Sequence, residues 1–310
     1  MERALQLAEK GRGTTYPNPV VGAVVVRNGE VVGEGWTEQP PGRHGEIVAL
    51  DSAGRLARGA TLYLTMEPCT HHGHTAPCVE RVLEAGVKRV VAATVDPNPE
   101  AAGGLDRLRD EGVDVELVDS FTARQQNEAW RTWMSLHRPY VIYKAAITLD
   151  GRMAVPGERW ITGQAARRRV HQLRAQVDAV AVGMGTVRAD DPQLDARDVD
   201  AARQPRRVAF GHGPLPDGSE LELRSGTLDD ELRALAGDGV QSLLLESGPT
   251  LAASFFEADL VDKLLLFVAP TIAGGDGPRF DPGVSRRLSH VTSEQLGEDV
   301  LLTGYVHEPL

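Results

Sequence analysis

The sequence predicts an α/β protein built from two domains. The chain has 310 residues, which is more than one average domain contains. In both halves, apolar runs of strand length alternate with segments that have helical spacing. A predicted helix over residues 121–137 ends against Arg138-Pro139, where a second alternation of strands and helices begins. We therefore expect one domain over residues 1–138 and another over residues 139–310.

Composition and charge weigh against several classes of protein. Hydrophobic residues make up 41% of the chain and charged residues 25%, as in globular proteins with sizeable cores. The formal net charge of -11 argues against a nucleic-acid-binding surface, although a few arginines suffice to bind one phosphate. The amphipathic start does not resemble a signal peptide, and no apolar run reaches membrane-spanning length. We expect a cytoplasmic protein that binds neither nucleic acid nor membrane.

The first half is predicted to form one three-layer α/β domain with the element order β-β-α-β-α-β-α-β. A short helix over residues 2–10 precedes these elements. Asn28-Gly29 is typical of a hairpin turn and joins strands over 20–26 and 30–36. The elements that follow are a helix from His44 to about Ala57, a strand over 60–65, a helix over 79–86, a strand over 88–95, a helix over 105–111 and a strand over 113–118.

The second half begins with an apolar strand over residues 139–148. Further apolar runs predict strands at residues 178–183, 206–211, 242–248 and 262–270. The segments 198–207 and 211–226 are polar or rich in turn residues, so we expect surface loops there. The charged run from Ala165 to Arg174 is typical of a solvated helix face.

The stretch from His44 to Cys78 carries the strongest chemical pattern of the chain. It contains both cysteines, Cys69 and Cys78, and a His-x-Glu pair, His44 and Glu46, at the start of a predicted helix. One histidine and two thiolates form a ligand set of catalytic zinc sites, which leave one position for water. The carboxylate beside them can move the protons of that water. The pattern therefore predicts a catalytic zinc site with Glu46 as the proton-transferring residue.

Two other interpretations of these residues stay open at this point. Cysteine is often buried for packing alone, so Cys69 and Cys78 could be small core residues. A structural zinc site is the second alternative, with His71, His72 or His74 as a fourth protein ligand. The order His-x-Glu, then Pro-Cys, then Cys is that of the zinc nucleobase deaminases, which favours the catalytic interpretation.

Longer motifs around these residues resemble one family. Residues 16–26 read Y-P-N-P-V-V-G-A-V-V-V, residues 67–78 read E-P-C-T-H-H-G-H-T-A-P-C, and residues 96–99 read D-P-N-P. With H-G-E at His44, they resemble the deaminase domain of the bifunctional riboflavin biosynthesis enzymes, in which alanine usually stands at the position of Gly45. The resemblance implies a cytidine-deaminase-like three-layer fold that binds one zinc ion. By this resemblance the zinc ligands are His44, Cys69 and Cys78, the proton shuttle is Glu46, and the substrate contacts are Asn18, His71 and His74.

The second half contains glycine-rich turns that can approach a phosphate closely. Residues 183–186 read G-M-G-T and follow a predicted strand, whereas G-P-T-L at residues 248–251 opens a predicted helix. Backbone amides at such positions can bind a phosphate. The spacing lacks the third glycine of a dinucleotide-binding fingerprint, so these residues alone are weak evidence for a nucleotide site.

Several segments of the second half together resemble the reductase domain of the same family. They read K-A-A-I-T-L-D-G-R from Lys144, E-R-W-I-T-G from Glu158, V-H-Q-L-R-A-Q from Val170, V-G-M-G-T-V-R-A-D-D-P-Q-L-D-A-R from Val182 and L-E-S-G-P-T-L-A from Leu245. The resemblance implies a dihydrofolate-reductase-like α/β fold with NADPH as cofactor. It places Ala146, Trp160, Thr186, Asp190, Gly248, Pro249, Thr250, Leu251, Ala252, Ala253 and Ser254 against NADPH, and Arg174, Leu194, Arg197 and Glu246 against the substrate. Guanidinium groups such as those of Arg174 and Arg197 bind phosphate bidentately.

The resemblance covers nearly the whole chain, with both halves in order. It implies a bifunctional enzyme of riboflavin biosynthesis, a hydrolase and an NADPH-dependent oxidoreductase. The expected reactions are deamination of 2,5-diamino-6-(5-phosphoribosylamino)pyrimidin-4-one and reduction of the ribosyl to a ribityl side chain. The alternatives are an active reductase beside a degenerate deaminase scaffold, a nucleic-acid base deaminase, and a non-catalytic nucleotide-binding module. We expect a homo-oligomer that acts on a small molecule.

Overall fold

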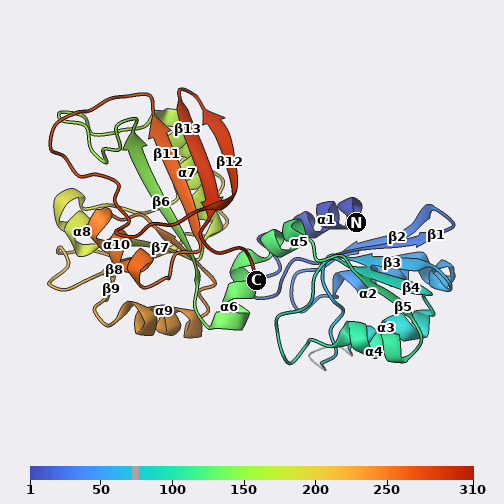
Figure 1. Ribbon diagram of the computed structural model, residues 1–310. Helices are drawn as coiled ribbons and strands as arrows, with labels where there is room; N and C mark the ends of the chain where they lie inside the picture. The colour runs from blue at the N-terminus through green and yellow to red at the C-terminus, as the bar shows by residue number, and fades with distance from the viewer. Residues whose placement is uncertain (72–76) are drawn as a thin grey trace. The chain divides into compact units, whose positions relative to one another are not determined.

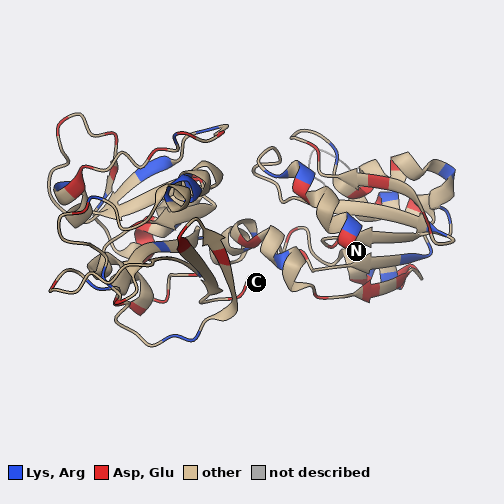
Figure 2. Ribbon diagram, turned by 90° about the horizontal axis from the view of Figure 1, so that it is seen from above, with Lys and Arg blue, Asp and Glu red and all other residues tan. Residues whose placement is uncertain are grey.

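The computed structural model describes residues 1–71 and 77–310 and divides into two compact units. The first unit is Met1–Ser135 together with Pro309–Leu310, and the second is Leu136–Glu308. Each unit is built around one β-sheet (Figure 1). Acidic and basic residues are interspersed over both units (Figure 2). In the described ranges, no helix combines the length and the apolar character needed to cross a membrane.

In the described part of the first unit, five strands form a sheet in the order β2-β1-β3-β4-β5. β1 is antiparallel to β2 and β3, whereas β3, β4 and β5 run parallel to one another. The strands are β1 (Gly22–Arg27), β2 (Glu30–Trp36), β3 (Thr61–Leu64), β4 (Arg89–Ala92) and β5 (Asp114–Leu117). The helices are α1 (Glu2–Ala8), α2 (Gly45–Ala53), α3 (Cys78–Ala85), α4 (Gly104–Asp110), α5 (Phe121–Gln126) and α6 (Glu128–Leu136), with 3-10 turns at Glu9–Gly11 and Gly54–Ala57.

Successive residues of β1 face opposite sides of this sheet, and helices cover both sides. Ala23 and Val25 belong to a core that includes residues of α2 and α3. Val24 points the other way and packs with Ala4 and Leu7 of α1. These contacts produce the three layers that the order of elements predicts.

Across residues 136–308, eight strands form the second sheet, in the order β12-β13-β11-β6-β10-β7-β8-β9. The strands from β11 to β9 in this order are parallel, and β13 and β12 continue the sheet in antiparallel fashion. They are β6 (Tyr140–Thr148), β7 (Ala179–Gly183), β8 (Arg206–Phe210), β9 (Glu222–Arg224), β10 (Ser242–Leu245), β11 (Lys263–Ala269), β12 (Ser289–Leu296) and β13 (Asp299–Tyr305). The helices are α7 (Gln164–Gln176), α8 (Met184–Asp190), α9 (Leu228–Gly237) and α10 (Pro249–Glu257).

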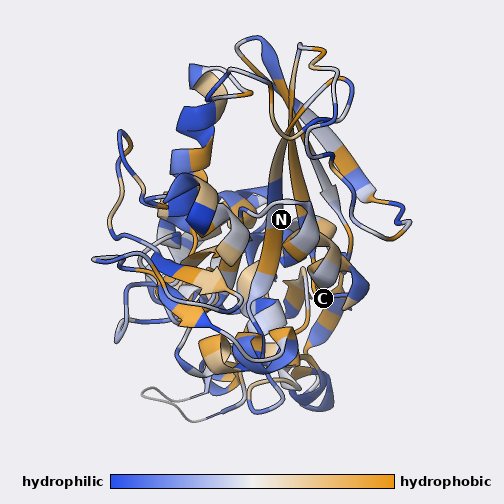
Figure 3. Ribbon diagram, turned by 90° about the vertical axis from the view of Figure 1, so that its left-hand side faces the viewer, coloured by the Kyte–Doolittle hydropathy of each residue, from blue (hydrophilic) through white to orange (hydrophobic). Residues whose placement is uncertain are grey.

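Apolar side chains fill both faces of the second sheet. Leu232 of α9 and Phe255 of α10 pack in one core, and Val170 of α7 and Val187 of α8 pack in another. In Figure 3 the strands between these helices carry the hydrophobic colour along much of their length. Helices on both faces of a largely parallel sheet make this an α/β unit.

The predicted continuous helix over residues 121–137 is wrong, because α5 ends at Gln126 and α6 begins at Glu128. Asn127 interrupts it and pairs its side chain with the backbone of Val20. The Val20 N–H donates to Asn127 Oδ1 at 2.9 Å, and Asn127 Nδ2 donates to the Val20 carbonyl at 2.9 Å. Helical spacing in the sequence contains no sign of this distant partner.

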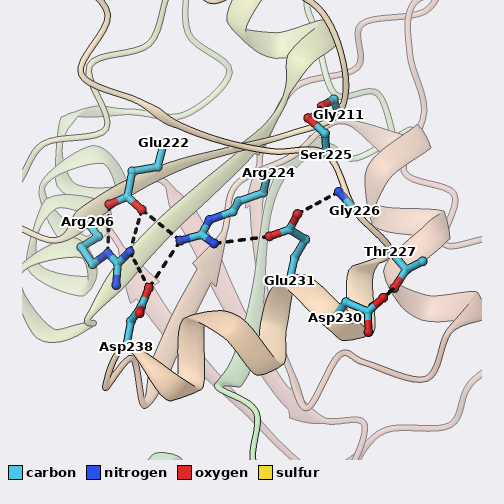
Figure 4. Close-up of polar contacts among 10 residues, drawn as sticks. All are labelled: Arg206, Gly211, Glu222, Arg224, Ser225, Gly226, Thr227, Asp230, Glu231 and Asp238. Carbon is cyan, nitrogen blue, oxygen red and sulfur yellow. Dashed lines mark hydrogen bonds and ion pairs between the residues drawn. The ribbon is translucent and has the colours of Figure 1, made fainter.

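The predicted loops over residues 198–207 and 211–226 are wrong in part, since β8 begins at Arg206 and β9 lies within the second segment. β9 has three residues, so it is too short to show an alternating pattern. Charged side chains rather than apolar ones hold it in place. Arg206, Glu222, Arg224, Glu231 and Asp238 form a network of ion pairs between β8, β9 and the α9 region (Figure 4).

Candidate functional site

Glycine residues set the position at which α2 begins. A Cβ atom on Gly35 of β2 would lie 2.3 Å from the carbonyl oxygen of Gly45. A Cβ atom on Gly45 would lie 2.6 Å from the carbonyl oxygen of Val21. The helix start therefore lies directly against the sheet. This contact holds His44, the residue before α2, and Glu46 in its first turn.

Cys69 and Cys78 reach the same place from two different segments. Cys78 is the first residue of α3, and Cys69 lies in the loop that follows β3. His44 Nδ1 lies 3.2 Å from Cys78 Sγ and 3.7 Å from Cys69 Sγ. The three donor atoms all lie within 4.8 Å of one another. The structure thus brings together the three zinc ligands that the sequence predicts.

The protonation of these groups fits a site for a divalent cation. The hydrogen bond from Cys78 lowers the pKa of the Cys69 thiol to about 4, despite the opposing effect of burial. The hydrogen bond to Cys69 raises the pKa of Cys78, and a bond to Cys69 likewise raises the pKa of His44 to about 9. The three donor groups are therefore linked to one another by hydrogen bonds. A zinc ion fits here because metal binding displaces such protons from thiol and imidazole ligands.

Glu46 is buried in the same cavity, with 4% of its surface exposed. Burial raises the pKa of its carboxyl group above the ordinary value. A carboxyl group buried in this cavity can accept and return a proton. Its position suits the proton transfers of a hydrolytic deamination.

A cavity of about 200 Å³ opens beside these residues. The predicted substrate contacts Asn18 and His71 both line it. The Nδ1 atom of His71 is buried and has no hydrogen-bond partner among the described residues, so it can bond to a ligand. The third predicted contact, His74, lies outside the described residues.

The cavity also contains polar residues for which the sequence predicted no role. Asp96 and Asn98 of the D-P-N-P segment line it. Burial raises the pKa of Asp96 to about 6. Glu67 accepts hydrogen bonds from the N–H groups of Asp96 at 3.0 Å and Leu105 at 2.9 Å, which fixes the loop. The sequence does contain a signal for Asp96 and Asn98, because these polar residues closely follow the predicted strand over residues 88–95, where functional residues often lie.

Apolar residues complete the wall of this cavity. Trp130, Trp133 and Met134 of α6 line it, together with Met66 after β3. Trp130 and Trp133 stand three residues apart and so share one face of α6, but which surface that face covers depends on the tertiary fold. No sequence signal identified them as cavity residues.

The predicted NADPH contacts in the second unit gather at one edge of the sheet. β6, β10 and β7 are adjacent and parallel, so their carboxyl ends lie together. Ala146 lies in β6, Thr186 and Asp190 lie in α8 after β7, and residues 248–254 begin α10 after β10. Open α/β sheets bind ligands at this edge. Trp160, between β6 and α7, is 52% exposed.

The start of α10 fits a phosphate-bearing cofactor. Pro249 is its first residue, and a Cβ atom on Gly248 would meet nothing within 4 Å, so the approach is open. The adjacent Ser247 hydroxyl is buried without a hydrogen-bond partner among the described residues. Free N–H groups of a helix start attract phosphate. These features suit NADPH.

Glu246 lies in a buried cluster with Arg174 and Lys144. Arg174 Nε lies 2.6 Å from Glu246 Oε1, Arg174 Nη2 lies 3.1 Å from Oε2, and Lys144 Nζ lies 3.5 Å from Oε2. Burial acts to raise the pKa of Glu246, but the positive charges of Lys144 and Arg174 outweigh it and lower the pKa to about 2. Lys144 was missed because a lysine within an apolar strand resembles a solvent-facing residue.

Leu194 and Arg197 lie in the segment that follows α8. Leu194 is buried, with a positive φ of 53°. Arg197 is exposed and pairs with Asp195 at 2.5 Å. Arg174 Nη1 donates to the Asp195 carbonyl at 3.1 Å, so this segment lies against the buried cluster.

Family models match both halves of the chain. The cytidine and deoxycytidylate deaminase zinc-binding region matches residues 1–94, and the RibD C-terminal domain matches residues 139–302. The RibD protein of Aquifex aeolicus is 37% identical over 342 residues, which cover 97% of this chain and 96% of that protein. The RibD protein of Mycobacterium tuberculosis is 41% identical over 329 residues, with coverage of 98% and 95%.

Solved structures have the same fold over the whole chain. The diaminohydroxyphosphoribosylaminopyrimidine deaminase/5-amino-6-(5-phosphoribosylamino)uracil reductase of Thermotoga maritima is 33% identical, with a TM-score of 0.85. Acinetobacter baumannii RibD, in one of its crystal forms, is 34% identical, with a TM-score of 0.84. Each alignment covers 98% of this chain and 97% of the other. The predicted order of a deaminase domain followed by a reductase domain is confirmed.

These matches decide between the alternatives that the sequence left open. A degenerate deaminase scaffold is not favoured, because the ligand set converges beside Glu46 and relatives match across both halves. The chain is a hydrolase and an oxidoreductase, with zinc and NADPH as the cofactors of its two domains. It belongs to the RibD family, the bifunctional deaminase-reductases of riboflavin biosynthesis.

Proposed function

We propose that residues 1–138 deaminate 2,5-diamino-6-(5-phosphoribosylamino)pyrimidin-4-one and that residues 139–310 then reduce the ribosyl group of the product. The observation that supports this most directly is the convergence of His44, Cys69 and Cys78 beside the buried carboxyl group of Glu46. The similar Thermotoga maritima protein is named for the corresponding deaminase and reductase activities.

The deamination follows from the residues of the first unit. Zinc held by His44, Cys69 and Cys78 would supply the Lewis acidity that makes water nucleophilic near neutral pH. Glu46 accepts a proton as the water oxygen bonds to the ring carbon that carries the amino group. Glu46 then returns a proton to that nitrogen, the carbon–nitrogen bond breaks, and ammonia leaves.

Three further residues of the first unit are assigned to orienting the pyrimidine. Asn18 and His71 line the cavity, and the buried, unpaired Nδ1 of His71 supports a direct hydrogen bond to the substrate. His74 is assigned the same role on the sequence resemblance alone. These residues orient the ring and do not take part in bond breaking.

The reduction uses the carboxyl edge of the second sheet. NADPH would supply a hydride to C1′ of the ring-opened ribose. We assign Ala146, Trp160, Thr186, Asp190 and residues 248–254 to the cofactor, and Arg174, Leu194, Arg197 and Glu246 to the phosphoribosyl substrate. Arg197 is exposed and can exchange Asp195 for a phosphate, whereas Arg174 is engaged with Glu246 and orients that carboxylate.

Three broader properties belong to this proposal. The substrate is a small molecule rather than a nucleic acid, in keeping with a net charge of -11 and interspersed charges (Figure 2). The edge strand β12 is largely exposed, which supports a homo-oligomer in which it is covered. Cys69 and Cys78 are free thiols although they lie close together, which supports a reducing compartment and so a cytoplasmic location.

Zinc content and both half-reactions, measured on the same purified chain, test the proposal. We expect about one zinc ion per chain, ammonia release from the diaminopyrimidine, and NADPH oxidation with the deaminated product. Deoxycytidylate serves as a control substrate that should release no ammonia. A zinc-loaded chain that leaves the diaminopyrimidine intact, or NADPH that is not consumed, would contradict the corresponding half of the proposal.

A further inference from the structure

One wall of the deaminase cavity comes from outside the region that this chain shares with cytidine deaminases. The match to the cytidine and deoxycytidylate deaminase zinc-binding region ends at residue 94. That region contains the predicted zinc ligands and Glu46, which are the parts needed for deamination in general. Trp130, Trp133 and Met134 of α6 line the same cavity although they follow that region by many residues.

The segment from Asn127 to Met134 also secures both rims of the cavity. Asn127 pairs with both backbone groups of Val20, beside the rim residue Asn18. Arg131 Nη1 donates to Thr94 Oγ1 at 3.2 Å and to the Val95 carbonyl at 2.9 Å, directly before Asp96 on the other rim.

These rim contacts are shielded from water, because Asn127 is 5% exposed and Arg131 is 3% exposed. Burial lowers the pKa of Arg131 to about 10, which leaves the guanidinium charged at neutral pH. Buried hydrogen bonds of this kind are costly to leave unmade, so they resist displacement of either rim. Asn127 and the short helix α6 that follows it thus contact both rims.

Trp130, Trp133 and Met134 differ in exposure, and this indicates different roles for them. Trp130 is 8% exposed and belongs mostly to the interior. Trp133 and Met134 are half-buried and still line the cavity, so part of each side chain remains open to a ligand. An indole face and a thioether offer dispersion contacts to a flat heterocycle. The polar groups that can hydrogen-bond to the ring edge come from the rims.

We infer that residues 127–134 form the substrate-recognition wall of the deaminase site. Trp133 and Met134 contact the pyrimidine of the substrate, and Asn127 and Arg131 are positioning residues that hold the rims. This inference rests on the proposed deaminase function. The zinc chemistry is thereby assigned to residues 1–94, the region shared with cytidine deaminases. Recognition of the substrate class, a pyrimidine that carries a phosphoribosylamino group, is assigned to residues 127–134.

The test compares Trp133→Ala and Met134→Ala with wild type in the full-length chain. Loss of one stacking face weakens binding about tenfold. We expect the KM of deamination to rise by about that factor in Trp133→Ala, with kcat little changed, because ground-state and transition-state binding are lost together. The phenylalanine variant Trp133→Phe keeps an aromatic face and should recover most of the affinity. Leu136→Ala removes an apolar residue that is 43% exposed and does not line the cavity, from the end of the same helix, and should leave the KM of deamination unchanged.

Zinc content and NADPH oxidation by each variant show whether the chain remains intact. Unchanged KM values in both alanine variants overturn the inference. Parallel loss of zinc, or failure of Trp133→Phe to restore binding, also overturns it, because a purely structural role of the helix predicts those results.

Calorimetric binding of the diaminopyrimidine to zinc-loaded Glu46→Gln, with and without Trp133→Ala, distinguishes the two proposals. Suppose that the wild-type chain releases no ammonia, but that Trp133→Ala still weakens binding of the diaminopyrimidine. This result contradicts the deaminase function and supports the recognition wall. Equal affinity in both chains contradicts the wall alone. Absence of binding in both contradicts the wall and the proposed substrate.

Discussion

Gly35 of β2 lies so close to Gly45 of α2 that a Cβ atom on Gly35 would stand 2.3 Å from the Gly45 carbonyl oxygen. Gly45 lies between His44 and Glu46, the predicted zinc ligand and proton shuttle. The distance between the backbones of β2 and α2 therefore determines where His44 and Glu46 lie. A residue that lines no part of the cavity controls its geometry.

The variant Gly35→Ala should displace the start of α2. Overpacking of this kind costs about 1–3 kcal/mol in the free energy of unfolding. We expect lower zinc content and slower ammonia release, with NADPH oxidation retained, since the second unit is a separate compact body. Gly237→Ala is the matched control, because its Cβ atom meets nothing within 4 Å. Full zinc content and wild-type ammonia release in Gly35→Ala would show that α2 tolerates the shift.

Glu46→Gln should keep the shape of the cavity and remove its proton carrier. Proton transfer by a positioned side chain contributes roughly 10²- to 10⁴-fold, so kcat for ammonia release should fall by that order. Zinc content should stay at the wild-type level, because Glu46 is not among the three converging donors. Equal rates of ammonia release from variant and wild type would remove Glu46 from the mechanism.

Removal of metal should separate the two activities of the chain. The predicted zinc ligands lie in the first unit, and the predicted NADPH contacts lie in the second. A chelator should therefore abolish ammonia release and leave NADPH oxidation with the deaminated substrate intact. Added zinc should restore the lost activity. Parallel loss of both activities would contradict this separation.

Arg174→Met should destabilise the second unit. It leaves the buried Glu246 carboxylate with Lys144 as its remaining cation, at 3.5 Å. Removal of one partner of a buried ion pair costs about 3 kcal/mol or more. Urea unfolding followed by circular dichroism measures this loss. The double variant Arg174→Met/Glu246→Gln should be more stable than Arg174→Met, since the buried carboxylate is gone and the charge that remains is that of Lys144, whose side chain is more exposed than that of Glu246 (18% against 8%). The reverse order would refute this account.

The same cluster predicts how acid affects the second unit. The pKa of Glu246 is about 2 in the folded chain and about 4.5 ordinarily, so the unfolded chain takes up this proton at higher pH. Its stabilising contribution is therefore complete above about pH 4.5 and is lost as the pH falls towards 2. Urea unfolding across this window should show a steeper decline for wild type than for Glu246→Gln. Identical slopes would mean that Glu246 does not keep this low pKa.

Local patterns carried most of what could be predicted from the sequence. His44, Cys69 and Cys78 could be predicted as zinc ligands because they stand in short motifs whose residue types are those of zinc sites, and the structure brings the three together. The two domains followed from strand and helix periodicity. The structure gives the positions of the described side chains in both sites. The role of each side chain in binding or catalysis stays a prediction.

What escaped prediction depends on contacts between distant segments. Asn127 breaks a helix because it pairs with Val20, and no local pattern encodes that partner. Trp133 looked like an ordinary helix residue until the fold placed it in the cavity wall. Lys144 lies in an apolar strand, and its role in the ion cluster appears only when Glu246 is brought beside it.

Cys69 and Cys78 are the only cysteines of the chain, and both lie at the predicted zinc site. A thiol-specific reagent therefore reports on a single place in the molecule. Thiolates that bind a metal react slowly with such reagents. The fraction of these two thiols that stays unmodified therefore measures the fraction of sites that hold metal, without an assay of activity. The same arrangement gives oxidants that act on thiols a single place to react. Oxidation of these thiols would stop the deamination and spare the reductase, so the pathway would be interrupted at the first of the two steps.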